Sequence, residues 1–426
     1  MRRFALILLA LLAVTPDLIG GSRNATQRLA ERNDADGPLA QSVWGFLAVN
    51  MKGDTLVNLN SGRRMVPASN LKLITTGAAL LNLGGDYRYS TTFATAAPVR
   101  DSVLAGDLVV IGGGDPLIGE LFPYLSAPDE TFGKWYKILT DNGIRSVAGD
   151  IIGDGSWFGG PQYHPDWNVE DVETRDGVVP SGLTWRGKMG DTLPDGPSTA
   201  ALRYREWLDA AAGQMAGHDG HISPAAPADP VAPDSLLILG SVESLPLRDL
   251  IRIANCQSDN FIAETLIKTL GKNINGDDAY GPSTEALHKA LAPLGLMAAS
   301  GRMRFADGSG LSRKNYVSPA FMVAFLRAMA RSRAWNDFLE SLPFPGEKET
   351  TLERRLPKRP YALRHRIRMK SGSMNGVRCF SGYILPQSGR KEEIIAFSIL
   401  TNNAVAQGSQ VYGLIDEMIE SLANEN

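Results

Sequence analysis

The stretch from Ser69 to Leu83 is apolar around almost its whole circumference when it is drawn as a helix. Its hydrophobic positions are Leu71, Leu73, Ile74, Ala78, Ala79, Leu80 and Leu81. A helix of this kind is stable only in the interior of a domain, so we expect other elements to pack on every side of it. Glycines at positions 84 and 85 predict its end. The chain has 426 residues, which is enough to build such a core.

Lys72 is the exception on this helix, because it places a charge in the first turn of an apolar segment. Burial disfavours the ionised amine and biases a lysine toward its neutral form, which can act as a base. Ser69 lies three residues earlier on the same face, at the end of the helix where backbone N–H groups are free. Ser-x-x-Lys therefore offers a nucleophile and a base within one turn. The pattern also arises often by chance, and a capping serine followed by a lysine that reaches solvent explains it as well.

The N-terminus has the pattern of an export signal. A basic start, Met1 to Arg3, precedes an apolar run over residues 4–14 that is too short to span a bilayer. We therefore expect a signal peptide over about residues 1–21, a periplasmic location and at most peripheral membrane association. The net charge is −3 and there is no basic block, which argues against a nucleic-acid partner.

Strand patterns occur at both ends of the remaining chain, and the segment between them has a different sequence pattern. The expected strands are 43–50, 55–60, 367–374, 378–385 and 394–402. Because a lone hairpin is marginal in water, we expect these five to form one antiparallel sheet against the helix at 69–83. Short strands between Gly, Pro and Asp clusters predict a β-rich module inserted in the middle. The predicted fold class is α+β, with a catalytic domain over 22–92 and 243–426 and the inserted domain over 93–242.

Two further short motifs follow the insertion. Residues 258–260, Ser-Asp-Asn, lie in a stretch with a helical pattern, and residues 370–372, Lys-Ser-Gly, lie in a β-run. Together with Ser69 and Lys72 they give S-x-x-K, S-x-N and K-[ST]-G in this order. Each motif has the local structure that penicillin-recognising serine enzymes require.

With these motifs the chain resembles the D-Ala-D-Ala carboxypeptidase/endopeptidase group typified by penicillin-binding protein 4, peptidase family S13. The similar segments are VPASNLKLITTGAALLNLGG, QSDNFIAETL, FADGSGLSR, KSGSMNGVRCFSGYI and, in the insertion, GDLVVIGGGDPLI and AGDIIGDGSWF. The resemblance implies a penicillin-binding-protein/β-lactamase-like transpeptidase domain with an inserted domain. It also implies serine-type D-Ala-D-Ala carboxypeptidase activity on peptidoglycan stem peptides through an acyl-enzyme. The resemblance further implies D,D-endopeptidase activity, and acylation by β-lactams, which act as covalent inhibitors.

By position, the resemblance implies a role for each motif residue. Ser69 is the nucleophile, Lys72 accepts its proton, and Ser258 passes a proton to the leaving amine. Asn260 orients Lys72 and the amide of the acyl group. Lys370 and Ser371 hold the terminal carboxylate of the substrate, while the backbone N–H groups of Ser69 and Ser373 form the oxyanion hole. The substrate-binding positions are therefore Asn260, Lys370, Ser371, Gly372 and Ser373. No metal or cofactor is implied.

The chain also departs from the pattern of the group. Ser371 stands where threonine is commoner, which keeps the hydroxyl. The interval from Lys72 to Ser258 is short, so we expect part of the insertion to be reduced, and residues 163–188 match the group poorly. Two alternative functions remain open for the chain: a β-lactamase-like hydrolase, and a penicillin-binding scaffold with little catalytic turnover.

Three smaller signals have plain structural interpretations. The glycine-rich run 307–310 predicts a tight loop lining the cleft rather than a phosphate loop. His218 and His221 lack a third ligand, so we do not expect a metal site there. Cys256 and Cys379 flank two different motifs, and we expect them to stay unbridged because those motifs hold the two backbones apart across the cleft.

Overall fold

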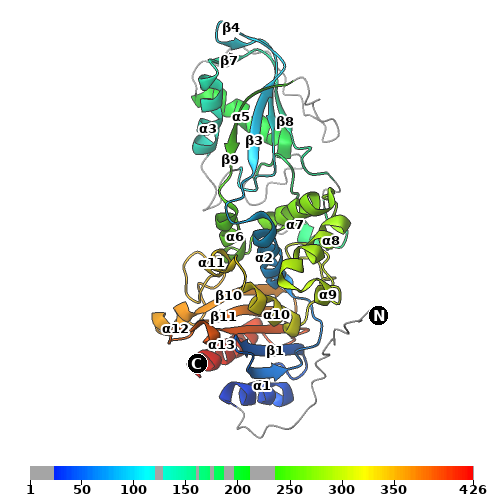
Figure 1. Cartoon of the computed structure of the whole chain (residues 1–426), viewed down its shortest axis with the longest axis vertical. Coiled ribbons are helices and arrows are strands. Elements are labelled where there is room, and N and C mark those ends of the chain that lie inside the picture. The colour runs from blue at the N-terminus through cyan, green and yellow to red at the C-terminus, as the bar shows by residue number, and fades with distance from the viewer. Residues whose placement is uncertain are drawn as a thin grey trace, which may run out of the picture.

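The computed structural model describes most of the chain after the predicted signal peptide. The described residues are 24–119, 128–159, 163–172, 177–186, 196–211 and 236–425. The molecule is elongated, with a sheet built from both chain ends at one extreme and the inserted segment at the other (Figure 1). Among the helices described, none combines the length and the apolar character needed to cross a bilayer.

The sheet unites the two ends of the chain, as predicted. Its strands are β1 (Val43–Asn50), β2 (Thr55–Leu59), β10 (Ile367–Met374), β11 (Val377–Ile384) and β12 (Ile395–Asn402). Their order is β10-β11-β12-β1-β2, and all neighbours are antiparallel. β1 pairs with β12 along its whole length, so the N-terminal hairpin completes a sheet that the last strands begin. β10, which carries the Lys-Ser-Gly motif, is left at one edge.

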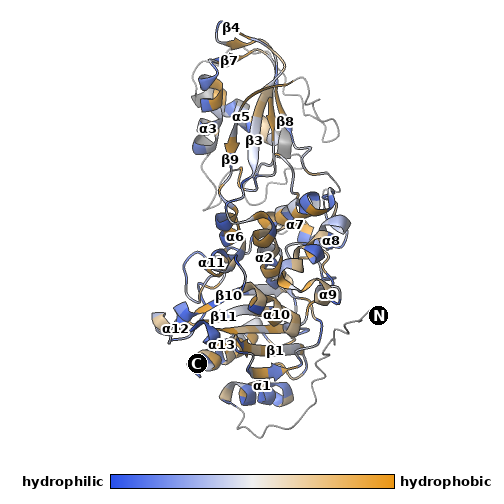
Figure 2. Ribbon diagram, in the orientation of Figure 1, coloured by the Kyte–Doolittle hydropathy of each residue, from blue (hydrophilic) through white to orange (hydrophobic). Residues whose placement is uncertain are grey.

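Helices cover both faces of this sheet because alternate strand residues point to opposite sides. On β1, Leu47 and Val49 join the core that contains α2 (Leu71–Leu83) and α10 (Pro319–Met329). Phe46 and Ala48 join the core on the opposite face, together with α1 (Ala25–Asp36) and α13 (Gly408–Asn424). Hydrophobic residues run along α2, whereas α1 is mainly hydrophilic (Figure 2).

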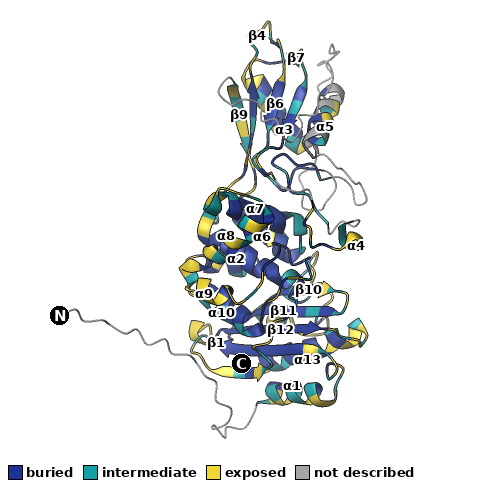
Figure 3. Ribbon diagram, turned by 90° about the vertical axis from the view of Figure 1, so that its right-hand side faces the viewer, coloured by how far each residue is buried: buried dark blue, intermediate teal, exposed yellow. Residues whose placement is uncertain are grey.

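α2 is the interior helix that its composition predicts. Every residue from Leu71 to Leu81 is buried, and Figure 3 shows the helix enclosed by its neighbours. The remaining helices of this part of the molecule are α6 (Leu247–Cys256), α7 (Asn260–Asn275), α8 (Tyr280–Ala290), α9 (Met297–Ser300), α11 (Trp335–Glu340) and α12 (Tyr361–Arg366). Of these, α6, α7, α8 and α11 contact α2 directly.

The inserted segment has its own sheets and its own core. Its elements are β3 (Ser90–Thr95), β4 (Val99–Arg100), β5 (Val103–Leu104), β6 (Leu108–Ile111), α3 (Pro128–Asp141), β7 (Ser146–Val147), β8 (Ile151–Asp154), α4 (Val169–Val172), α5 (Gly196–Ala211) and β9 (Leu237–Glu243). One sheet has the order β8-β6-β3-β9 and a small one the order β4-β5-β7. The core includes Phe93, Trp135 and Tyr204. The prediction of a β-rich module is therefore incomplete, because the long helices α3 and α5 pack with the strands of this segment.

Candidate active site

The turn that carries Ser69 is held at the edge of the sheet by close backbone packing. Ser69 lies in a short 3-10 turn, η1 (Ala68–Asn70), immediately before α2. The Asn70 side chain donates hydrogen bonds to the carbonyls of Lys370 and Cys379, each at 3.2 Å. A Cβ at Gly372 would lie 2.8 Å from the carbonyl oxygen of Pro67, so only glycine allows β10 to approach the turn this closely.

Lys72 is fully buried, and its amine contacts three oxygen atoms. Its Nζ lies 3.0 Å from Ser69 Oγ, 2.6 Å from Asn260 Oδ1 and 2.8 Å from the carbonyl oxygen of Ser309. An ammonium group has three N–H donors, so these three oxygens can satisfy all of them. The structure therefore brings the predicted nucleophile, the predicted base and Asn260 together, although 188 residues separate Lys72 from Asn260 along the chain.

The glycine-rich loop at 307–310 forms part of this site. Ser309 supplies the carbonyl that meets Lys72, and the backbone N–H groups of Gly308 and Ser309 donate to the carboxyl of Glu264 on α7. Burial, with the charge of Asp307 nearby, raises the pKa of Glu264 to about 8. The loop is thus anchored on a buried carboxyl group whose pKa lies above its ordinary value.

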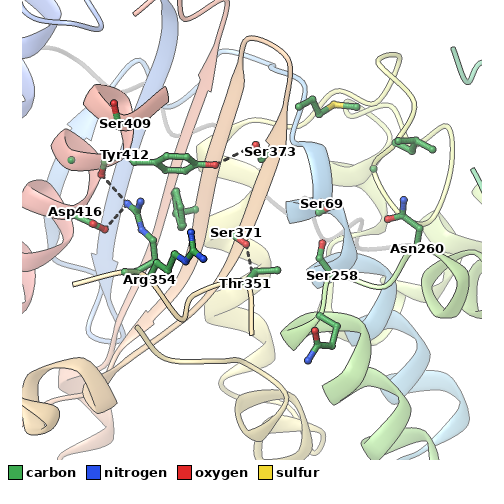
Figure 4. Close-up of a pocket in the computed structure, with 17 residues that line it drawn as sticks. Ser69, Ser258, Asn260, Thr351, Arg354, Ser371, Ser373, Ser409, Tyr412 and Asp416 are labelled. Atoms are coloured by element: carbon green, nitrogen blue, oxygen red, sulfur yellow. Dashed lines mark hydrogen bonds and ion pairs between the residues drawn. The ribbon is translucent and has the colours of Figure 1, made fainter. Parts of the chain in front are cut away.

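Ser258 lies between two helices rather than within one, so the prediction of a continuous helical stretch is wrong at this residue. α6 ends at Cys256 and α7 begins at Asn260, and Ser258 has a positive φ of 60°. Asp259 causes the break, because its side chain caps α7 by accepting a hydrogen bond from the backbone N–H of Ile262. The turn places Ser258 on the side facing Ser69 (Figure 4).

The capping Asp259 is also paired with a residue of the inserted segment. Arg186 Nη2 lies 2.7 Å from Asp259 Oδ2, and the two side chains are only 9% and 3% exposed. In the same way Trp167 Nε1 donates to Asp307 Oδ2 at 2.9 Å, at the start of the glycine-rich loop. Two buried contacts therefore connect the insertion to two loops of the site.

β10 presents its motif residues on alternating sides. Lys370 is fully buried, and its Nζ donates to the carbonyl of its neighbour Ser371 at 2.9 Å. Burial, together with the nearby charge of Lys72, holds the pKa of Lys370 well below its usual range. On the other side, the hydroxyl of Ser371 donates to Thr351 Oγ1 at 2.8 Å, and Tyr412 OH donates to the exposed Ser373 at 3.2 Å.

These residues surround a cavity of about 840 Å³. It is lined by Ser69, Gln257, Ser258, Asn260, Gly310, Leu311, Thr351, Arg354, Arg355, Ser371, Ser373, Met374, Phe380, Ser409, Tyr412, Gly413 and Asp416. Five of the predicted site residues are in the lining, with Ser69, Ser258 and Asn260 at one end and the β10 serines between them and α13 (Figure 4). Lys72, Lys370 and Gly372 lie behind this surface.

Several residues of the site carry no sequence signal that identifies them. Arg186 and Trp167 belong to the segment 163–188, which contains none of the three motifs. Thr351 and Arg354 precede β10 in a stretch without a regular hydrophobic pattern. Tyr412 lies in α13, whose sequence pattern indicates a helix with one apolar face and no functional residue. The glycine-rich run at 307–310 is the exception, since it was expected to line the cleft and does so through Gly310.

The potential metal ligands are scattered over the part of the chain that the structure describes. No group of three or more His, Cys, Asp or Glu side chains there is arranged to hold an ion. His218 and His221 lie outside the described residues. Cys256 and Cys379 are both buried and free, which confirms the prediction that they do not pair.

Comparison with known proteins identifies the family of the chain. The model of the D-Ala-D-Ala carboxypeptidase 3 (S13) family matches residues 25–192 and 227–424. A D-alanyl-D-alanine carboxypeptidase of Actinomadura sp. (strain R39) is 28% identical over 476 residues, covering 93% of this chain and 85% of the relative.

Solved structures give the same fold. Penicillin-binding protein 4 of Haemophilus influenzae superimposes with a TM-score of 0.75 at 20% identity, covering 93% of this chain and 98% of that one. A penicillin G-acylated predatory endopeptidase of Bdellovibrio bacteriovorus superimposes with a TM-score of 0.57 at 18% identity, covering 90% and 92%. Both the predicted fold class and the predicted resemblance are confirmed. The chain belongs to the S13 family of D-Ala-D-Ala carboxypeptidases, and it is a peptidase with the fold of the penicillin-binding protein 4 group.

Proposed function

We propose that Ser69 attacks the carbonyl of the penultimate D-alanine and that Lys72 removes its proton. The contact that supports this most directly is the 3.0 Å separation of Lys72 Nζ from Ser69 Oγ. In its neutral form the amine donates its two N–H groups to Asn260 and to the carbonyl of Ser309. Its lone pair then faces the Ser69 hydroxyl and accepts the proton as the C–O bond forms.

A second buried lysine, Lys370, limits how readily the two amines can both carry a charge. Two buried ammonium groups near each other disfavour one another, and the lowered pKa of Lys370 reflects this repulsion together with burial. A neutral Lys72 beside a serine is the state that general-base catalysis requires. We propose that Lys370 acts from behind the surface that binds the substrate. Its Nζ is enclosed there and donates to the Ser371 carbonyl.

The remaining roles follow the positions around the cavity. Ser258 lines the cavity together with Ser69, and we assign it the transfer of a proton to the leaving nitrogen as the C–N bond breaks. The backbone N–H groups of Ser69 and Ser373 form the oxyanion hole, and Gly372 allows the close approach of β10 that this needs. Asn260 positions Lys72 and the amide of the acyl group, and we place the substrate carboxylate at Ser371, whose hydroxyl donates to Thr351 Oγ1.

The substrates we propose are stem peptides of peptidoglycan that end in D-Ala-D-Ala, and D-alanyl cross-links. β-Lactams would acylate Ser69 because they mimic the same peptide bond. The endopeptidase from Bdellovibrio is acylated by penicillin G in its own structure. We place the enzyme in the periplasm after removal of the signal peptide at 1–21, with at most peripheral membrane contact. Residues 93–242 would form a separate domain, supported by their own core.

Release of D-alanine from a peptide ending in D-Ala-D-Ala tests this proposal. The wild-type protein should release free D-alanine, measured by a coupled oxidase assay, and a Ser69→Ala protein that unfolds at the same temperature should release none. A cross-linked muropeptide, separated by chromatography, measures the endopeptidase activity in parallel. An active Ser69→Ala protein, or a wild-type protein that cleaves neither substrate, would contradict the proposal.

A further inference from the structure

The motif lysines do not supply a positive charge at the surface of the cavity. Lys72 and Lys370 are both fully buried, and neither is among the residues that line it. The substrate of a D-Ala-D-Ala carboxypeptidase nevertheless ends in a carboxylate, which needs hydrogen-bond donors and a cation within reach. The cations that do line the cavity are Arg354 and Arg355.

Arg355 is already neutralised within the protein. Its Nη2 lies 2.6 Å from Asp416 Oδ1 and 2.8 Å from the carbonyl of Tyr412. Its guanidinium also lies over the rings of Phe380 and Tyr412, 5.1 and 4.5 Å from their centroids. With a side chain only 12% exposed, Arg355 fixes the wall between β11 and α13 and has little charge left for a ligand.

Arg354 differs from its neighbour in each of these respects. It is exposed at the cavity, and among the described residues it has no hydrogen-bond or ion-pair partner. Arg354 lines the same cavity as the hydrogen-bonded pair Ser371 and Thr351 (Figure 4). Because Ser371 donates to Thr351 Oγ1 at 2.8 Å, the Thr351 hydroxyl keeps its own proton for another acceptor.

We propose that Arg354, Thr351 and Ser371 form the subsite that binds the C-terminal carboxylate on the leaving-group side. This inference rests on the proposed function and deepens it by naming the group that distinguishes an acid from an amide terminus. A guanidinium can meet both carboxylate oxygens with parallel N–H groups, while the hydroxyl of Thr351 donates a further hydrogen bond. Arg354 acts here as a specificity-determining residue, and the bond-making steps stay with Ser69 and Lys72.

The test compares one peptide ending in D-Ala-D-Ala as the free acid and as the C-terminal amide. For the wild-type enzyme we expect a lower KM for the acid. Arg354→Ala should reduce this preference about tenfold, chiefly through KM for the acid and with a smaller change in kcat. Arg354→Lys keeps the positive charge but lacks the two parallel N–H groups of a guanidinium, so it should retain part of the preference for the acid.

Lys358→Ala is the matched control, because Lys358 is an exposed cation of the same loop that does not line the cavity. It should leave the preference for the acid unchanged. Suppose the wild-type enzyme cleaves the acid. The subsite is then refuted, and the proposed function stands, if Arg354→Ala keeps the full preference for the acid or if its activity toward the acid and the amide falls by the same factor. If the wild-type enzyme cleaves neither peptide, the proposed function itself fails and the subsite with it.

Discussion

The contact between Arg186 and Asp259 makes the site depend on the inserted segment, and replacing Arg186 with alanine tests this dependence. Asp259 uses one carboxylate oxygen for Arg186, at 2.7 Å, and the other for the backbone N–H of Ile262. Arg186 also donates to the carbonyl of Pro116 at 3.3 Å, and its guanidinium lies 5.1 Å from the centre of the Phe261 ring. The substitution therefore removes every one of these interactions at once.

The expected loss of stability follows from the burial of the pair. With exposed fractions of only 9% and 3%, the two side chains are shielded from water, and the substitution removes the guanidinium from a carboxylate that stays buried. Breaking a buried ion pair in this way costs about 3–5 kcal/mol. Because Asp259 lies between Ser258 and Asn260, we also expect the turn to shift. A shift of about 1 Å in a catalytic group costs about 10²-fold in rate.

Urea unfolding and the rate of acylation by a fluorescent penicillin measure these two effects. Arg88→Ala is the control, because Arg88 pairs at 3.6 Å with Glu243 at the base of the same insertion while the side chains are 39% and 65% exposed. Such an exposed pair contributes about 0–1 kcal/mol. If Arg186→Ala loses no more stability than Arg88→Ala and is acylated at the wild-type rate, the insertion does not support the site as we infer.

Two further predictions concern groups buried around Ser69. Lys72→Arg should lower the rate of penicillin acylation by at least about 10²-fold, because a guanidinium stays protonated near neutral pH; an unchanged rate would show that another residue is the base. Glu264→Gln should alter the pH dependence of stability. Burial raises the pKa of Glu264 to about 8 from an ordinary value of 4.5, so the folded state binds the extra proton between these values. The free energy of unfolding should therefore fall as pH rises from 4.5 to 8, and fall less steeply in Glu264→Gln; parallel curves from urea titrations would contradict the protonated carboxyl.

Periodicity made the sheet and the interior helix predictable from the sequence. The strand at 367–374 was expected with its observed bounds, and the Asn-Gly turn that follows it marks its C-terminal end. The helix at 69–83 was expected from its composition, although its first residues form a 3-10 turn. The motif residues could be found because each lies within a local pattern of a few positions.

The missed features are those that depend on contacts between distant parts of the chain. The apolar pattern on both sides of Ser258 continues through the break, and nothing local marks the positive φ at that residue. Arg186 pairs with a residue 73 positions away, and Trp167 with one 140 positions away. Arg354 gains its place only because β10 and α13 meet beside it. Such placements follow from tertiary packing, which a single sequence does not show.

The assignment of Ser69 as the nucleophile is the central claim, and intact-mass spectrometry with peptide mapping after benzylpenicillin treatment tests it most directly. The wild-type protein should gain the mass of one benzylpenicillin, and the modified peptide should contain Ser69. Ser69→Ala should gain nothing under the same conditions while unfolding at a similar temperature, since the change removes only one hydroxyl from the turn. A wild-type adduct on another residue, or a labelled Ser69→Ala protein, would contradict the account.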